Sequence, residues 1–457
     1  MIAELRPYPS MTDSGLPWLG KMPLGWSTHR LKSVFREVDQ RSGTGNEPLL
    51  SLRMREGLVD HHAMGGRAIP PSSLVNYKVT RPGEIVMNRM RAAAGLFAAT
   101  RTLGLVSPDY AVLRPRTRVD LDYFVKLFRT PLMMAIFRLE SRGLGTGESG
   151  FLRLYAERFG MLAVPVPPPV EQAAIARFLG HVDRQIRRYV RAKQKLINLL
   201  EEQQQAIIRR AVTRGLDVNV QLKPSDVDWL GDVPRHWELR RLKFLARIKT
   251  GGRDTVDRKG DGDYPFFVRS QSVERIDSFS FDGEAVLTAG DGAGVAKVFH
   301  YVVGKFDFHQ RVYKCSNFRH VCGRFFFYYF RCTLRYEAFR ETAKSTVDSL
   351  RLPMLQNFPV LLPPWDEQLE IVELITRETA AVERSLATVR HEVDLLLEYR
   401  SRLIADVVTG KLDVREAAAR VPGEAGEPEP PDEVEPLAEG DEAEGAGLDE
   451  PAEAADL

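Results

Sequence analysis

Two long stretches of the chain place apolar side chains at alternating intervals of four and three residues, the spacing of one face of an α-helix. They cover 171–214 and 367–410. A helix of about 44 residues is roughly 60–65 Å long at 1.5 Å per residue. Neither helix can bury its apolar face alone, so we expect the two to pack together as a coiled coil. The alternative is that each helix docks separately onto its own domain. The expected seam residues are Ile175, Leu179, Val182, Ile186, Leu196 and Leu200 in the first helix, and Ile371, Ile375, Val382, Leu386, Val389, Val393, Leu396 and Leu403 in the second.

Both helices are bounded by residues that start and stop helices. Prolines at 167–169 and at 363–364 precede them, and Gly215 and Gly410 stand at their far ends. Proline suits the first helical turn, and glycine suits the residue that follows the last turn.

The stretches outside these helices contain short apolar runs bounded by glycine and proline, as β-strands are. Further helices are expected at 121–139 and 325–339. The pattern therefore predicts domains of mixed helix and sheet, of the α/β or α+β class. The expected strands lie at 84–87, 111–113, 285–288 and 311–313.

The chain consists of two tandem copies of one arrangement. The segment Trp18-Leu-Gly-Lys-Met-Pro-Leu-Gly-Trp26 recurs as Trp229-Leu-Gly-Asp-Val-Pro-Arg-His-Trp237, a shift of 211 residues. Glu171-Gln172 recurs as Glu367-Gln368, a shift of 196 residues that persists along the helices. The copies share their starts and ends and differ in their middles, which indicates a pseudo-twofold scaffold around two domains with different tasks.

This repeat suggests five segments. They are a first domain at 1–165, a central long helix and linker at 166–222, a second domain at 223–362, a C-terminal long helix at 363–415 and an acidic tail at 416–457.

Composition indicates a cytoplasmic protein with no membrane partner. The chain is 44% hydrophobic, yet it contains no apolar run of about 18 residues. The N-terminal residues include Pro7 and Pro9 and are unlike a signal peptide. Cys315, Cys322 and Cys332 form no CxxC pair, which suits a reducing compartment.

The net charge of +2 hides two opposite parts. Residues 416–457 carry 15 acidic residues and one basic residue, whereas 1–415 carry 63 basic and 47 acidic residues. A folded part with a net charge of +16 suits a polyanion such as DNA. The tail has no aromatic residue, and we expect it to be disordered. A solubilising extension is the simpler interpretation, and competition with DNA for the basic surface is the alternative.

The chain lacks the motifs of several enzyme classes. It has no GxxxxGK[ST] phosphate-binding loop. The glycine-rich stretches at 143–147 and 290–294 suit tight turns better than cofactor loops. Leu362-Pro363-Pro364-Trp365 has leucine where a base methyltransferase needs a polar residue.

No metal-ligand spacing is evident either. His320 lies among the three cysteines at spacings that do not suit zinc, and His61-His62 suits a surface loop. We therefore expect no catalytic residue, no metal site and no cofactor in this chain.

These motifs give the chain a family resemblance. Its Trp-Leu-Gly-x-x-Pro-x-x-Trp segments, each followed by Arg-Leu-Lys, and the helix start at Pro364-Trp365-Asp366-Glu367-Gln368 resemble those of the specificity subunit of type I restriction–modification systems. Segments 82–91 and 106–110 are similar to one type of target-recognition domain. Segments 288–299 and 308–311 are similar to another. The resemblance covers about 15–415 and leaves out the tail.

The resemblance implies a function without catalysis by this chain. Two target-recognition domains would lie at opposite ends of two long antiparallel helices, and each would recognise one half of a bipartite sequence in double-stranded DNA. Two methyltransferase subunits would dock on the chain, joined by restriction subunits that translocate DNA. S-adenosylmethionine, ATP and Mg²⁺ would belong to these partners. Because the two middles differ, the target would be asymmetric.

Residues with polar side chains in expected loops and strand edges are the candidates for DNA contact. They are Asn88, Arg89, Arg91, Tyr110, Arg142, Ser149 and Arg153 in the first domain, and Arg269, Gln271, Lys297, His309, Gln310, Arg311, Lys344, Ser349 and Arg351 in the second.

Two other functions remain as alternatives. One is a DNA methyltransferase or nuclease with degenerate motifs, which would bind S-adenosylmethionine or cut DNA with Mg²⁺. The other is a structural coiled-coil protein whose end domains bind proteins.

Overall fold

The computed structural model describes residues 5–65, 69–144, 151–342 and 349–422. It divides into two compact units. The first unit is Met1–Val182 together with Leu403–Leu457, and the second unit is Asp183–Arg402. No helix of the described residues is long and apolar enough to cross a membrane.

The first unit is built on an antiparallel four-stranded sheet in the order β4-β11-β8-β9. Its strands are β4 (Phe35–Val38), β8 (Ile85–Asn88), β9 (Phe97–Ala99) and β11 (Tyr110–Pro115). Two-stranded pairs surround it: β1 (Met11–Asp13) with β2 (Lys21–Pro23), β3 (Ser27–Arg30) with β14 (Ala163–Val166), β5 (Leu50–Arg53) with β6 (Gly57–Asp60), β7 (Lys78–Thr80) with β10 (Gly104–Val106), and β12 (Arg142–Leu144) with β13 (Phe151–Arg153). Short helical segments join them: α1 (Leu31–Val34), α2 (Pro71–Leu74), η1 (Ala92–Ala94) and α5 (Ala156–Met161).

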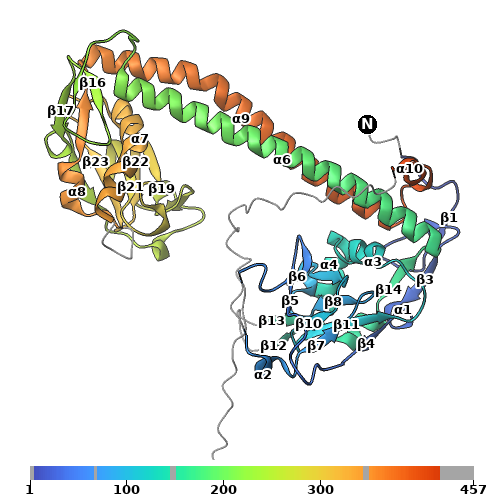
Figure 1. Ribbon diagram of the computed structural model, residues 1–457. Coiled ribbons are helices and arrows are strands. Elements are labelled where there is room, and N and C mark those ends of the chain that lie inside the picture. The colour runs from blue at the N-terminus through green and yellow to red at the C-terminus, as the bar shows by residue number, and fades with distance from the viewer. Residues whose placement is uncertain (1–4, 66–68, 145–150, 343–348, 423–457) are drawn as a thin grey trace, which may run out of the picture. The chain divides into compact units, whose positions relative to one another are not determined.

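The helix expected over 121–139 is two helices, α3 (Leu121–Phe128) and α4 (Pro131–Glu140) (Figure 1). Thr130 starts the second helix, because its side chain accepts a hydrogen bond from the backbone N–H of Met133. Pro131 follows and has no N–H to continue the preceding helix. Phenylalanines of both helices pack with those of β4 and β9; the ring centroids of Phe97 and Phe128 are 5.0 Å apart.

The second unit contains a six-stranded sheet in the order β18-β23-β21-β22-β19-β20. Only β19 and β22 run parallel; the other neighbours are antiparallel. The strands are β18 (Arg247–Thr250), β19 (Tyr264–Phe267), β20 (Val273–Ile276), β21 (Phe281–Ala289), β22 (Phe299–Phe308) and β23 (Val312–Ser316). Around the sheet lie the pairs β15 (Leu222–Pro224) with β16 (Asp232–Pro234) and β17 (Glu238–Arg241) with β24 (Pro359–Leu362), and the segments η2 (Leu242–Phe244), η3 (Thr255–Asp257), η4 (Gly292–Gly294), α7 (Gly323–Thr342) and α8 (Leu352–Asn357).

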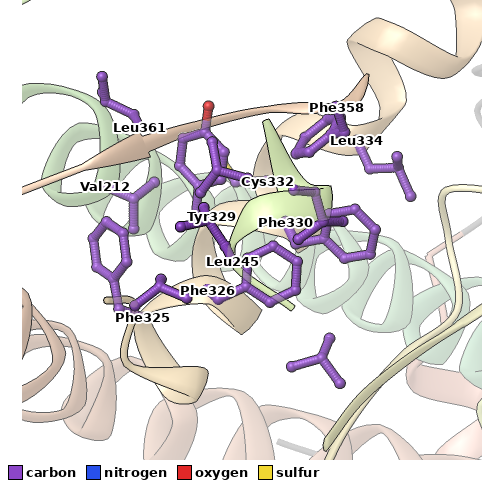
Figure 2. Packing of buried hydrophobic residues seen from close by; sticks show 14 of the residues in the cluster. Val212, Leu245, Phe325, Phe326, Tyr329, Phe330, Cys332, Leu334, Phe358 and Leu361 are labelled. Carbon is purple, nitrogen blue, oxygen red and sulfur yellow. The ribbon is translucent and has the colours of Figure 1, made fainter. Parts of the chain in front are cut away.

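Successive residues of a strand point to opposite faces, and this sheet has buried side chains on both of its faces. Val286 and Cys315 belong to the core cluster that includes the aromatic residues of α7. Figure 2 shows this cluster, in which Phe325, Phe326, Tyr329 and Phe330 gather with Leu245 and Phe358. On the other face, residues that alternate with these pack against phenylalanines of β19 and β22.

The two long helices are α6 (Pro169–Arg214) and α9 (Trp365–Val408). Within the second unit they run antiparallel, because Lys193 binds Glu392 at 2.7 Å whereas Glu201, further along α6, binds the earlier Arg390 at 2.6 Å. Ile197 of α6 packs in one apolar cluster with Val382, Leu386 and Val389 of α9, and Leu200 of α6 packs against it. The expected packing of the two helices is therefore confirmed.

Most of the expected seam residues are buried or half-buried, but the prediction that Leu196 lies in the seam is wrong. Its side chain is 40% exposed, whereas Ile197 is 5% exposed and packs against Val382, Leu386 and Val389. The strict four-three count shifts by one residue here because a straight α-helix has 3.6 residues per turn. Buried residues are Ile175, Leu179, Val182, Ile186, Ile371, Ile375, Val382, Leu386, Val389 and Leu403, and half-buried ones are Leu200, Val393 and Leu396.

The segment expected to be a disordered tail from 416 begins with a helix, α10 (Arg415–Arg420). Ala418 is buried, and its carbonyl accepts a hydrogen bond from Arg177 at 2.7 Å. The rest of that prediction, from 423 onward, lies outside the described residues.

Candidate nucleic-acid interface

One glutamine in each copy fixes the start of a long helix. Gln172 accepts a hydrogen bond from the backbone N–H of Asp120 at 2.8 Å and donates to the carbonyl of Pro167 at 2.8 Å. Gln368 accepts from the N–H of Cys322 at 2.7 Å and donates to the carbonyl of Pro363 at 3.0 Å. The repeated Glu-Gln motif thus has a structural task, which is to fasten α6 and α9 to the domains that precede them.

The repeated tryptophan has a similar task in the second unit. Trp237 is fully buried and donates from its indole to Glu367 at 3.0 Å. Gly215, which follows the last turn of α6 with φ of +74°, leaves room for this ring, since a Cβ there would lie 3.0 Å from it. The shared sequence ends therefore build the scaffold, and the expected DNA-contact residues lie in the divergent middles.

In the first unit, expected DNA-contact residues gather where β8 ends and β11 begins. Asn88 and Tyr110 are cross-strand partners, and the side-chain oxygen of Asn88 accepts from the N–H of Arg91 at 3.1 Å. Arg91 is exposed. Arg89 forms an ion pair with Glu37 and its side chain is only 16% exposed. Arg89 therefore stabilises the fold, while Asn88 and Arg91 shape and occupy the turn.

The β12–β13 hairpin brings further candidates to the same place. Arg142 pairs with Arg153 across the hairpin, and Leu154 donates its N–H to the carbonyl of Arg89 at 2.9 Å. Arg153 binds the carboxylate of Asp109 at 2.8 Å, and its side chain is 19% exposed. This backbone hydrogen bond places the hairpin beside the turn after β8, and Arg91 and Arg142 are exposed basic residues of these two segments.

In the second unit, two candidate arginines share one carboxylate. Asp291 binds Arg269 at 3.1 Å and Arg311 at 2.5 Å. Burial raises the pKa of Asp291, but hydrogen bonds and charges of these arginines outweigh it and keep the pKa below its usual value. Nearby, Gln310 donates its side-chain N–H to Asp254 at 2.6 Å. Aspartates therefore orient three of the expected DNA-contact side chains.

Other candidates of the second unit surround this group. His309 is 3% exposed, and its Nδ1 accepts the backbone N–H of Arg311 at 3.0 Å. His309 is therefore a positioning residue and not an exposed one. Ser349 is exposed and pairs through its backbone with Asp291. Lys297 is exposed after η4.

Gln271 and Arg351 are exposed, the former two residues after Arg269 and the latter at the residue before α8. Ser149 and Lys344 lie outside the described residues.

The acidic partners of these cations were missed by sequence reasoning. Asp291 lies between Gly290 and Gly292, where a turn was expected but no function was assigned. An acidic residue in a basic loop is the one signal that could have marked it. Its two partners are about 20 residues away on either side along the chain, in the loops that follow β19 and β22, so only the sheet pairing brings the three side chains together.

The cysteines belong to the interior of the second unit. Cys315 and Cys332 lie in its core cluster, and burial raises the pKa of Cys315 to about 12. Within the described ranges, no group of three His, Cys, Asp or Glu side chains is arranged to hold a metal ion.

Comparison with known proteins relates the chain to one family. The model of the type I restriction modification DNA specificity domain matches residues 234–386. The chain is 29% identical over 182 residues to the EcoDI specificity subunit of Escherichia coli, a match that covers 40% of each protein. It is 20% identical over 350 residues to the MjaVIII specificity subunit of Methanocaldococcus jannaschii, covering 68% of this chain and 75% of that protein.

A solved chain from work on complex assembly and conformational transition of a type I restriction–modification system shares the fold. Its TM-score is 0.63 at 16% identity, and the match covers 86% of this chain and 99% of that chain. The match to EcoDI spans less than half of that protein. The chain is thus similar to type I specificity subunits, and the model of their DNA specificity domain matches its residues 234–386.

Proposed function

We propose that this chain is the DNA-binding specificity subunit of a type I restriction–modification complex. The observation that carries the proposal is the group formed by Arg269, Asp291 and Arg311, which presents two exposed guanidinium groups inside the matched specificity domain. Surrounding loops add further side chains that can donate to phosphates and base edges. The excess of basic residues over 1–415 supports affinity for a polyanion.

The two units are proposed to recognise unlike half-sites. The first unit gathers its candidates on a turn and a hairpin, around Asn88, Arg91 and Arg142. The second gathers them on loops around Asp291. Because the side chains differ in kind and in their supporting elements, a single base sequence cannot suit both, and the target is asymmetric.

The long helices are proposed to set the gap between the half-sites. The 46 residues of α6 correspond to about 69 Å of helix at 1.5 Å per residue. Two turns of B-DNA measure roughly 70 Å. This agreement supports a bipartite target whose halves lie one to two turns apart.

Catalysis is assigned to partner subunits. Two methyltransferase subunits would use S-adenosylmethionine, and restriction subunits would use ATP and Mg²⁺; this chain would supply sequence recognition and no catalytic residue. A cytoplasmic location, where both DNA and these partners are present, follows from the same proposal.

Selection of bound DNA tests the proposal. The full chain, with and without its methyltransferase partner, is incubated with duplexes carrying about 30 random base pairs, enough for two helical turns, and the bound fraction is sequenced. We expect one bipartite motif with unlike halves and a fixed gap. Enrichment of no motif, with an affinity that depends on salt alone, would contradict sequence recognition. Bound S-adenosylmethionine or DNA cleavage by the chain alone would favour an enzyme.

A further inference from the structure

The two arginines that share Asp291 are arranged unequally. Arg311 binds one carboxylate oxygen through a terminal nitrogen at 2.5 Å, and Arg269 binds the other oxygen in the same way at 3.1 Å. The side chain of Arg311 is 62% exposed, that of Arg269 is 45% exposed, and that of Asp291 is 16% exposed. Arg311 is therefore the side chain of this group that extends furthest into solvent.

The backbone around Arg311 is fixed on both sides. Its N–H donates to Nδ1 of His309 at 3.0 Å, and its carbonyl accepts the N–H of Gly290 at 2.8 Å. A Cβ on Gly290 would lie 2.9 Å from that carbonyl, so the close approach needs glycine. Leu350 donates its N–H to the carbonyl of Gly290 at 2.8 Å, which ties a third segment to the loop. Such support lowers the entropy lost when the side chain binds.

The paired carboxylate argues against a phosphate contact. A phosphate gains most from an uncompensated cation, whereas Asp291 is ionised and would repel a phosphate held by either arginine. Arg269 offsets the charge of Asp291, so the group keeps a net charge of +1. A neutral base edge rich in acceptors suits this group better than a phosphate does.

The free edge of Arg311 matches one base. Within the described part of the chain, its guanidinium makes no hydrogen bond other than that to Asp291, so Nε and the second terminal nitrogen can donate. These two nitrogens form a planar fork. Guanine presents two acceptors, O6 and N7, side by side in the major groove, and arginine binds them in a bidentate manner. Adenine offers an acceptor and a donor there and cannot accept both bonds.

We propose that Arg311 recognises a guanine in the half-site bound by the second unit, and that Asp291 is the positioning residue that orients it. The proposal rests on the proposed function and names the base that this site selects. Arg269 balances the charge of Asp291, and His309 and Gly290 hold the loop.

Arg311→Gln in the full chain tests the assignment. Binding is measured with duplexes that carry the selected motif and with a set in which each base pair of the half-sites is replaced in turn. For the unmodified chain, we expect replacement of one G·C pair to weaken binding about 5- to 150-fold. For Arg311→Gln, we expect discrimination at that base pair to fall to within about threefold, while discrimination at the other half-site is unchanged.

Two further variants separate positioning from folding. Arg240→Gln removes an exposed arginine that also pairs with a carboxylate, at 2.8 Å from Glu238, but on β17. We expect Arg240→Gln to leave discrimination at the G·C pair unchanged. Asp291→Asn keeps an oxygen acceptor and removes a negative charge. We expect it to reduce discrimination at the same G·C pair while strengthening binding to unrelated DNA at low salt, a change that loss of structure alone would not produce.

Four results would overturn the proposal. Uniform weakening of all duplexes by Arg311→Gln, with a salt slope smaller by about 1, would identify a phosphate contact. A half-site of the second unit that contains no G·C pair would contradict recognition of guanine. Unchanged discrimination by Arg311→Gln at every position would contradict it as well. Absence of any bipartite motif with the unmodified chain would reject the proposed function itself, and with it this assignment.

Discussion

At the residue scale, side chains that look alike in sequence have different tasks. Arg89 and Arg311 both stand in basic stretches, yet Arg89 is held by Glu37 inside the first unit, whereas Arg311 projects from a loop. Burial and pairing decide this difference, and both depend on strands far apart in the sequence. Sequence patterns therefore predict candidates for DNA contact, but they do not predict which of these side chains are buried, paired or exposed.

The buried glutamine of the second copy gives a residue-scale prediction. In Gln368→Glu, the carboxylate can no longer donate to the carbonyls of Pro363 and His320, which lie 3.0 Å from the amide nitrogen. We expect the free energy of unfolding to fall by about 2–3 kcal/mol, because a buried acceptor loses its donor. Chemical denaturation measures this loss. Gln203→Glu, at an exposed position of α6, is the matched control and should change stability by less than about 0.5 kcal/mol. Equal effects of both changes would contradict the role given to Gln368.

His309 gives a prediction of pH dependence. Burial lowers the pKa of His309; the charges of Arg269 and Arg311 act in the same direction, whereas Asp254 and Asp291 oppose them. Because the folded pKa lies below that of the unfolded chain, the stabilisation is complete above about pH 6.5 and is lost as the pH falls through the folded value.

Thermal unfolding at pH 7.5 and pH 5.5 checks this dependence. The Tm of the unmodified chain should fall more between these pH values than that of His309→Asn, whose side-chain oxygen can still accept a hydrogen bond but does not titrate. The same decrease in both proteins would show that His309 does not contribute to it.

At the element scale, the sequence predicted the long helices well and the short ones less well. Proline and glycine bounded α6 and α9 correctly, because those residues act through local backbone geometry. The break at Thr130 between α3 and α4 was missed although it also carries a local signal, a capping residue followed by Pro131. The burial of Ile197 in place of the expected Leu196 was not predictable from spacing alone, because the partner helix decides which of two adjacent apolar residues is buried.

The packing of α6 against α9 gives an element-scale prediction. Leu386→Ala removes a side chain that is 5% exposed in the cluster with Ile197, Val382 and Val389. We expect a loss of about 2–4 kcal/mol in unfolding free energy, from lost burial and the cavity left behind. Leu395→Ala, 49% exposed on the same helix, should cost less than about 0.5 kcal/mol. Circular dichroism during denaturation reports both. A cost at Leu395 as large as that at Leu386 would mean that the helices pack through another face.

At the scale of the whole molecule, internal repetition was the most informative feature of the sequence. The repeated motifs predicted a doubled scaffold, and Gln172 and Gln368 do make equivalent hydrogen bonds. The divergent middles carried no such signal, so the arrangement of Arg269, Asp291 and Arg311 emerged only from the sheet that joins their loops. Scaffold positions recur within one chain, whereas the candidate DNA-contact positions differ between the copies.

The proposed spacing role gives a prediction at this scale. A seven-residue insertion in α6 near Asn198, matched by one in α9 between Arg390 and Glu392, keeps the coiled-coil register. It lengthens both helices by about 10 Å, or roughly three base pairs of DNA. We expect the gap between the half-sites to increase by about three base pairs while both half-sites stay the same. Altered half-sites with an unchanged gap would contradict the role of the helices. Selection from random duplexes distinguishes the two results.

A genome-wide map of adenine methylation in the native host, compared with a strain that lacks this gene, tests directly whether this chain is the specificity subunit of a type I complex. We expect one bipartite motif, with two unlike halves around a fixed gap, to lose its methylation in the deletion strain and to regain it when the gene is restored. Methylation of a bipartite motif that persists without the gene, or loss of a continuous motif instead, would contradict this role.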